Sequence, residues 1–226
     1  MAKPVLLVHG FTTSARRTWA EPGWIDLITE AGRPVLAPDL LGHGDGPKPH
    51  DVAAYDEVED LVAAVLPPDG PVDAIGYSAG AGVLLSLAAA QPERFDRLVL
   101  GGVGASLFRA QNGTPILDAI EGRGDPDNQI TARFKMLAET DGNDPQALAA
   151  FIARPRPPWT ADRLAVVASP TLVVVGDQDF AGPAEPLADA LPNGQSLTLA
   201  GIDHFGLPKA FPFLEQALDF IGAAPF

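Results

Sequence analysis

The chain has 226 residues, a length sufficient for one α/β domain with a sizeable core. Of these residues 46% are hydrophobic and 19% charged, as is usual for a globular protein. Its formal net charge of −14 disfavours nucleic acid and anionic lipid as partners. Because the chain has no cysteine, disulfides, thiolate metal sites and a cysteine nucleophile are excluded. No apolar run approaches the roughly 18 residues of a membrane span, and no signal-peptide pattern is recognisable, so we expect a soluble cytoplasmic protein.

Apolar runs and helical patterns alternate along most of the chain. The almost continuous apolar run Pro4-Val5-Leu6-Leu7-Val8 is typical of a central parallel strand. The later strands are predicted at 34–37, 72–75, 95–100, 170–175 and 196–199. The predicted helices lie at about 24–31, 55–65, 81–90, 184–191 and 210–221. Six strands alternating with helices predict an α/β fold with a mostly parallel, doubly wound sheet.

The alternation lapses between Gly101 and about Trp159, where only short helical patterns occur between charges and turn residues. This stretch is too small to fold alone. We therefore predict one structural domain, with a core formed by residues 1–102 and 161–226 and a small helical insertion at 103–160 that lies over the edge of the sheet.

The stretch Gly76-Tyr77-Ser78-Ala79-Gly80 joins the strand predicted at 72–75 to an apolar, alanine-rich helix. A serine at such a strand-to-helix corner has strained backbone dihedrals, and glycines two residues to either side relieve the crowding. The corner lifts the Ser78 hydroxyl clear of the sheet and sets the Ala79 amide at a helix N-terminus, where an anion is favoured. We interpret the stretch as a nucleophile elbow.

A serine hydroxyl is a poor nucleophile until a base, normally an imidazole oriented by a carboxylate, takes its proton. His204 follows the last predicted strand, at the carboxyl edge where α/β sheets keep their sites. The other histidines, all before Ser78 in the chain, are His9, His43 and His50. Position and chain order therefore favour His204 as the base.

The orienting acid is expected after a strand between Ser78 and His204. Asp177 and Asp179 both follow the apolar strand at 170–175, and either of them could instead cap the following turn or helix. We favour Asp179, which lies further out on the loop, and keep Asp177 as the alternative. Asp203, next to His204, is expected to stabilise its own turn.

Acyl transfer also needs hydrogen-bond donors for the oxyanion that develops on the substrate. The Ala79 amide is one candidate, and the second is expected in the loop after the first strand, where Gly10-Phe11 brings the Phe11 N–H towards the elbow. Each such donor lowers the barrier by about 3 kcal/mol.

Taken together, these motifs resemble the α/β-hydrolase fold superfamily. The stretches that carry the resemblance are His9-Gly10-Phe11, Asp39-Leu40-Leu41-Gly42-His43-Gly44-Asp45, the elbow, Gly176-Asp177-Gln178-Asp179 and Asp203-His204-Phe205. The likeness covers nearly the whole chain except the insertion. The two strands that usually lead the fold are missing, because Lys3 enters what matches the third strand, so a shortened sheet of about six strands is expected.

The resemblance implies a catalytic triad of Ser78, Asp179 and His204, and an oxyanion hole formed by the Phe11 and Ala79 amides. It also makes residues 103–160 a cap over the active site. Within the superfamily the chain is most similar to small esterase, lactonase and thioesterase-like members. Serine rather than aspartate at position 78 disfavours haloalkane dehalogenase and epoxide hydrolase chemistry.

The expected activity is hydrolysis of a small carboxylic ester, thioester or lactone through an acyl-enzyme, with no cofactor and no metal ion. Two alternatives stay open: hydrolysis of a carbon–carbon bond on the same triad, and ligand binding without catalysis. The sequence does not identify the substrate or the oligomeric state.

Two sets of insertion residues have both a plain and a functional interpretation. Cations of this stretch could receive a substrate carboxylate, although a solvated surface is the default: Arg133, Lys135, Arg154 and Arg156. Aromatic residues could line an acyl pocket, although packing within the insertion is more usual: Phe108, Phe134, Phe151 and Trp159.

Overall fold

The computed structural model describes residues 2–110, 112–140 and 142–224 of the chain. Its centre is a single sheet of six parallel strands in the order β2-β1-β3-β4-β5-β6. The strands are β1 (Val5–Val8), β2 (Val35–Leu36), β3 (Val72–Tyr77), β4 (Phe95–Gly101), β5 (Thr171–Gln178) and β6 (Gly194–Asp203). The predicted number of strands and their parallel arrangement are confirmed. The order reverses between β1 and β3, which is where a doubly wound sheet opens a crevice at its carboxyl edge.

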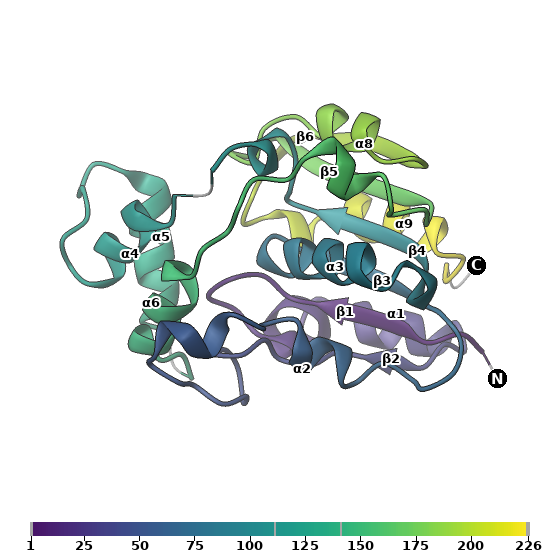
Figure 1. The fold of residues 1–226 in the computed structure, drawn as a ribbon, viewed down its shortest axis with the longest axis horizontal. Coiled ribbons are helices and arrows are strands. Elements are labelled where there is room, and N and C mark those ends of the chain that lie inside the picture. The colour runs from purple at the N-terminus through teal and green to yellow at the C-terminus, as the bar shows by residue number, and fades with distance from the viewer. Residues whose placement is uncertain (1, 111, 141, 225–226) are drawn as a thin grey trace.

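Helices cover both faces of the sheet (Figure 1). Strand residues alternate between two hydrophobic clusters, so that Val5 and Leu7 face one side and Leu6 and Val8 face the other. Helices α1 (Trp24–Glu30) and α9 (Phe211–Phe220) pack on the first side. Helices α2 (Asp60–Ala63), α3 (Ala79–Ala90) and α8 (Glu185–Ala190) pack on the second.

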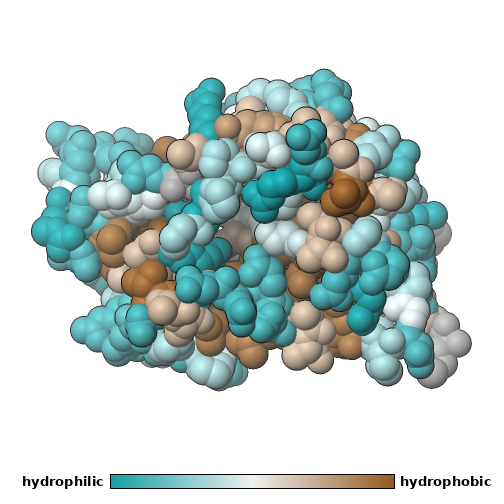
Figure 2. Space-filling model, in the orientation of Figure 1, coloured by the Kyte–Doolittle hydropathy of each residue, from teal (hydrophilic) through white to brown (hydrophobic). Residues whose placement is uncertain are grey.

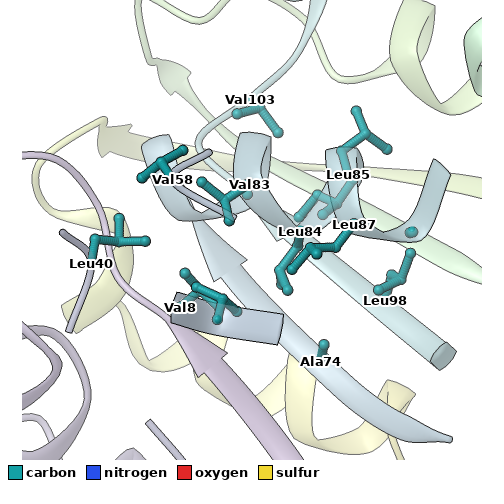
Figure 3. Packing of buried hydrophobic residues seen from close by; sticks show 14 of the residues in the cluster. Val8, Leu40, Val58, Ala74, Val83, Leu84, Leu85, Leu87, Leu98 and Val103 are labelled. Carbon is teal, nitrogen blue, oxygen red and sulfur yellow. The ribbon is translucent and has the colours of Figure 1, made fainter. Parts of the chain in front are cut away.

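Helix α3 is buried because its apolar residues occur on nearly every side. Its side chains Val83, Leu84 and Leu87 lie over the strand residues Val8 and Ala74 (Figure 3). This packing fixes the start of α3 against the carboxyl ends of β1 and β3, and so fixes the corner that carries Ser78.

The stretch between β4 and β5 is helical, and its helices labelled α4, α5 and α6 lie beyond the ends to which the strands point (Figure 1). Its elements are η4 (Ala105–Phe108), α4 (Thr114–Ile120), α5 (Gln129–Ala138), α6 (Pro145–Ala153) and α7 (Ala161–Leu164). The caps of α5 and α6 are side chains: Asn128 accepts from the Ile130 and Thr131 amides, and Asp144 from the Gln146 and Ala147 amides. The division into a core of residues 1–102 and 161–226 and a cap of residues 103–160 stays a prediction.

Two local expectations need correction, and one short helix was not predicted. The single helix predicted over 55–65 is broken into the 3-10 helix η2 (Val52–Tyr55) and the short α2. The strand predicted at 196–199 extends over the whole of β6, and an unpredicted π-helix, η1 (Arg16–Ala20), follows the first loop. Periodicity cannot resolve such short helices, because a single turn is too short to distinguish the periods of 3-10, π- and α-helix.

No helix in the part of the chain that the structure describes is long and apolar enough to cross a membrane. On the face in Figure 2, hydrophobic residues form patches between hydrophilic ones, as is usual for a protein surface.

Candidate active site

Ser78 lies at the corner between β3 and α3, and its backbone has a strained conformation. Its φ of 53° and ψ of −114° lie outside the regions that serine ordinarily adopts. The Ser78 amide donates to the Gly101 carbonyl of β4 at 2.8 Å, which ties the corner to the neighbouring strand. The elbow predicted from the sequence therefore has the strained geometry expected of it.

The structure brings Ser78, His204 and Asp179 into one hydrogen-bonded chain. His204 Nε2 lies 2.9 Å from Ser78 Oγ, and His204 Nδ1 lies 2.9 and 3.0 Å from the two Asp179 carboxylate oxygens. Because a carboxylate only accepts hydrogen bonds, Nδ1 carries the ring proton, and Nε2 is left to accept the proton of the serine hydroxyl. This arrangement can withdraw a proton from Ser78 Oγ.

Both partners of the serine are buried and held by further contacts. His204 is 3% exposed, and Tyr77 Oη donates to its backbone carbonyl at 2.7 Å. Asp179 Oδ1 also accepts from the Ala181 amide at 2.8 Å, and the Phe180 ring lies 4.2 Å from the imidazole ring, centroid to centroid. Burial raises the pKa of the Tyr77 phenol well above its ordinary value, so it remains a hydrogen-bond donor at neutral pH.

The alternative acids have other partners. Asp177 lies next to the last residue of strand β5, and its exposed carboxylate accepts from the Gly201 amide at 2.8 Å. Asp203 accepts from the Gly206 amide at 2.7 Å, as expected for a residue that stabilises its own turn. Within the described residues, only Asp179 of the three makes a hydrogen bond to the His204 ring.

The two amides predicted to hold an oxyanion adjoin the serine. Phe11 and Ala79 line the same cavity as Ser78 and His204, and neither amide donates to another described residue. Gly10 explains the close approach of the first loop, because a Cβ there would lie 2.7 Å from the Tyr77 ring and 3.3 Å from Ser78 Cβ. Two unused donors beside a candidate nucleophile are suited to a developing negative charge.

The cavity over Ser78 has a volume of about 390 Å³, within the range of small-molecule sites. Its walls come from the elbow, from the 55–59 turn and from the helical stretch between β4 and β5. Of the aromatic residues considered from the sequence, Phe134, Phe151 and Trp159 line it, and Phe108 does not. These rings also belong to the hydrophobic core, so packing and pocket lining coincide.

The expectation of a solvated surface is wrong for Arg154 and Arg156, which are part-buried and line the cavity. Burial lowers the pKa of Arg154 to about 10, with a further contribution from the neighbouring Arg156 charge. This burial cannot be recognised in the local sequence, because it arises from how the segment after α6 folds back over the elbow.

Two more histidines are buried beside the site, although they lie in loops. His9 Nε2 accepts from the Leu40 amide at 3.0 Å, and His43 packs its ring edge-on against Phe11. Burial and the neighbouring His9 lower the pKa of His43 to about 3. Burial alone would raise the pKa of Asp39, but hydrogen bonds from the Ala15 and Asp45 amides help to lower it to about 2.

Across residues 2–110, 112–140 and 142–224, no group of three or more His, Cys, Asp or Glu side chains could hold a metal ion.

A model of the Alpha/beta hydrolase family matches residues 5–223. A pimeloyl-(acyl-carrier protein) methyl ester esterase of Neisseria meningitidis is 39% identical over 114 residues, which are 49% of this chain and 40% of that protein. A 2-hydroxymuconate semialdehyde hydrolase of Pseudomonas sp. is 35% identical over 126 residues, 53% of this chain and 42% of that protein. The matched part of the chain thus spans less than half the length of these curated relatives.

Among solved structures, a thermophilic esterase from Thermogutta terrifontis superposes with a TM-score of 0.74 at 24% identity, covering 97% of this chain and 89% of that one. At this identity the likeness supports a shared fold.

Proposed function

Since the chain belongs to the alpha/beta hydrolase family, we propose that it is a serine hydrolase that cleaves a small carboxylic ester, thioester or lactone through an acyl-enzyme. The observation that carries the proposal is the hydrogen-bonded chain from Ser78 through His204 to Asp179, at 2.9 Å for its first step. Similarity to an esterase of Neisseria meningitidis supports an ester as the substrate.

In the proposed reaction, Ser78 Oγ attacks the substrate carbonyl carbon while its proton passes to His204 Nε2. The carbonyl oxygen becomes an oxyanion that the Phe11 and Ala79 amides stabilise. His204 then returns the proton to the leaving alcohol or thiol as the carbon–oxygen or carbon–sulfur bond breaks. Water, deprotonated by His204, releases the acid from Ser78 by the same route in reverse.

Asp179 acts in this scheme on His204 alone. Its carboxylate accepts from Nδ1–H, which fixes the tautomer that leaves Nε2 free, and its negative charge stabilises the imidazolium that forms. The Tyr77 hydrogen bond to the His204 carbonyl holds the backbone that carries the base.

The first experiment measures hydrolysis of p-nitrophenyl butyrate and labelling by a fluorophosphonate. Wild type is expected to show a burst of p-nitrophenol and to label, and Ser78→Ala is expected to lose at least about a thousandfold in kcat/KM and all labelling. Full activity in Ser78→Ala would refute the assignment, and a wild-type chain that neither labels nor hydrolyses would favour a ligand-binding protein.

The identity of the acid is tested by a matched pair of substitutions. Asp179→Asn is expected to lower kcat by about 10⁴-fold, because the amide no longer selects the productive tautomer. Asp177→Asn removes a carboxylate from the same strand end and is expected to leave kcat close to wild type, since that group only accepts from the Gly201 amide. Equal losses in the two variants would contradict the assignment.

The second candidate function is hydrolysis of a carbon–carbon bond on the same residues. The observation that favours it is the 35% identity to a 2-hydroxymuconate semialdehyde hydrolase. This function predicts turnover of vinylogous diketones and little turnover of esters, so the two substrate classes separate the candidates.

A further inference from the structure

The segment that leaves α6 brings two arginines to the cavity. Arg154 and Arg156 alternate with prolines in Arg154-Pro155-Arg156-Pro157-Pro158, and the proline rings restrict the backbone of the whole segment. Both arginines line the cavity that also holds Ser78 and His204. They are therefore presented from a stiff support to the same space as the nucleophile.

Each arginine has a structural contact that uses little of its hydrogen-bonding capacity. Arg154 Nη1 donates to the Phe151 carbonyl at 2.7 Å, and Arg156 Nη2 donates to the Ile152 carbonyl at 3.4 Å. These bonds help to end α6, but a guanidinium has five N–H donors. The Arg156 Nε–H is buried without any hydrogen-bond partner among the described residues.

The two positive charges are also not neutralised. In the described part of the chain, neither guanidinium has a carboxylate oxygen within 4.0 Å, the distance limit of an ion pair. Glu59 lines the same cavity, and its charge favours the protonated form of Arg154 from a greater distance. Burial and the proximity of the two cations lower the pKa of Arg154, so an anion placed between them would relieve both effects.

We propose that Arg154 and Arg156 bind a carboxylate at the far end of an ester substrate, so that the preferred substrates are monoesters of dicarboxylic acids. The inference rests on the proposed function and names its substrate class. The planar forks of two guanidiniums suit a carboxylate, which accepts several hydrogen bonds at once. In the overall reaction one water cleaves the ester bond, giving the dicarboxylate, the alcohol and one proton.

Because the chain has a net charge of −14, the preference for an anionic substrate can arise only within the pocket. A negatively charged chain repels anions at long range, so association gains nothing from the overall field. Selection of the anion would come from the two arginines within the pocket and would show in kcat/KM at ordinary ionic strength.

The experiment compares two esters of equal length, the p-nitrophenyl monoester of adipic acid and p-nitrophenyl hexanoate, which has a methyl group in place of the carboxylate. Wild type is expected to prefer the anionic ester by about tenfold or more in kcat/KM, and Arg154→Gln and Arg156→Gln to reduce that ratio by about 10- to 100-fold. Arg123→Gln is the control, because it removes the same charge from an exposed position in the same helical stretch and is expected to keep the ratio. Equal rates on both esters in wild type, or an unchanged ratio in both cavity variants, would overturn the proposal.

A binding measurement separates this proposal from the proposed function. Calorimetric titration with adipate is expected to show binding to wild type and to Arg123→Gln, and at least about tenfold weaker binding to Arg156→Gln. If wild type hydrolyses neither ester, the proposed function fails and the titration alone decides on the anion site. Absence of adipate binding, or binding that survives in Arg156→Gln, overturns the site. Should Arg156→Gln not fold, Arg156→Lys, which keeps the charge and loses the planar fork, serves in both measurements and is expected to weaken adipate binding and the preference.

Discussion

His43 is a buried imidazole that the proposed reaction does not use. Its Nδ1–H donates to the Leu41 carbonyl at 3.0 Å, while Nε2 is buried with no partner among the described residues. The rings of Phe11 and Phe151 lie edge-on to it at 5.6 and 4.8 Å between centroids. A proton on Nε2 would place a charge in this apolar contact, which is why burial lowers the pKa of His43 to about 3.

This lowered pKa predicts that the protein loses stability in mild acid. The unfolded chain binds the His43 proton near pH 6.5 and the folded chain only near pH 3, so the free energy of unfolding decreases as the pH falls through this interval. At about pH 5 the loss from this residue is about 2 kcal/mol. His43→Asn, whose amide can still donate to Leu41, is expected to lose that share of the pH dependence in urea unfolding measured at about pH 7.5 and pH 5.

The control for this measurement is His50→Asn, which removes an exposed imidazole that pairs with Asp144. In that variant the free energy of unfolding is expected to decrease between the two pH values by the share that His43 causes, as in wild type. If His43→Asn and wild type lost equal stability between the two pH values, His43 would not be the group responsible.

At the residue scale, chain order and strand position were enough to predict the residues of the candidate triad. The order Ser78, Asp179, His204 along the chain and the position of each at a strand end identify the three residues that the structure joins by hydrogen bonds. The same reasoning named Arg154 and Arg156 among four cations of the cap stretch, but it could not show that these two are part-buried at the cavity, because that depends on long-range packing of the cap stretch over the elbow. Nor could it see that His43, in a glycine-rich loop, is fully buried.

At the element scale, the start of α3 is the feature on which the site depends. Gly80 and Gly82 both lie in this helix, but their surroundings differ. A Cβ on Gly80 would overlap the backbone carbonyl oxygens of Val8 and His9, whereas a Cβ on Gly82 would meet nothing within 4 Å. The helix therefore packs directly against the end of β1 at one glycine and leaves open space at the other.

This contrast predicts opposite effects of the same substitution. Gly82→Ala is expected to raise the free energy of unfolding by about 0.5–1 kcal/mol, the ordinary gain from replacing glycine within a helix. Gly80→Ala is expected to lower it by about 1–3 kcal/mol, because the backbone of β1 must move, and to reduce ester hydrolysis, because Ser78 moves with the helix. Urea unfolding of both variants provides the measurement, and changes of equal sign and size would contradict this account of the elbow.

Periodicity and turn residues predicted the boundaries of several long helices and strands, but they did not predict those of the short ones. Strands β1 and β4 and helices α1 and α9 lie within a residue or two of their predicted ranges. The 55–65 stretch was less predictable, because its apolar positions suit one long helix. In the fold, Tyr55 ends η2 and packs on Phe151 of α6, and Val58 lies in the turn between η2 and α2. Tertiary contacts, not local propensity, decide such a break.

At the scale of the whole molecule, the described residues of the cap stretch form no separate hydrophobic cluster. Its buried residues join the cluster that covers one face of the sheet, and the Phe11 ring from the loop after β1 stacks on Phe151 of α6 at 5.5 Å between centroids. Phe134 of α5 lies 5.9 Å from the same ring. Phe11 thus joins the cap to the core at the place where its amide is proposed to serve the reaction.

We therefore predict that cap and core unfold in one cooperative transition. The three tryptophans make this measurable, because Trp159 belongs to the cluster shared with the cap while Trp19 and Trp24 lie in the cluster on the opposite face. Trp159→Phe leaves Trp19 and Trp24 as reporters, and the double variant Trp19→Phe/Trp24→Phe leaves Trp159. In each variant the fluorescence midpoint in urea is expected to coincide with the midpoint from far-UV circular dichroism, even where the substitution shifts both. A Trp159 signal that changes at lower urea than the dichroism would instead mean that the cap separates first. Such early separation would require the core to stay folded without the cap, which the shared cluster gives no reason to expect.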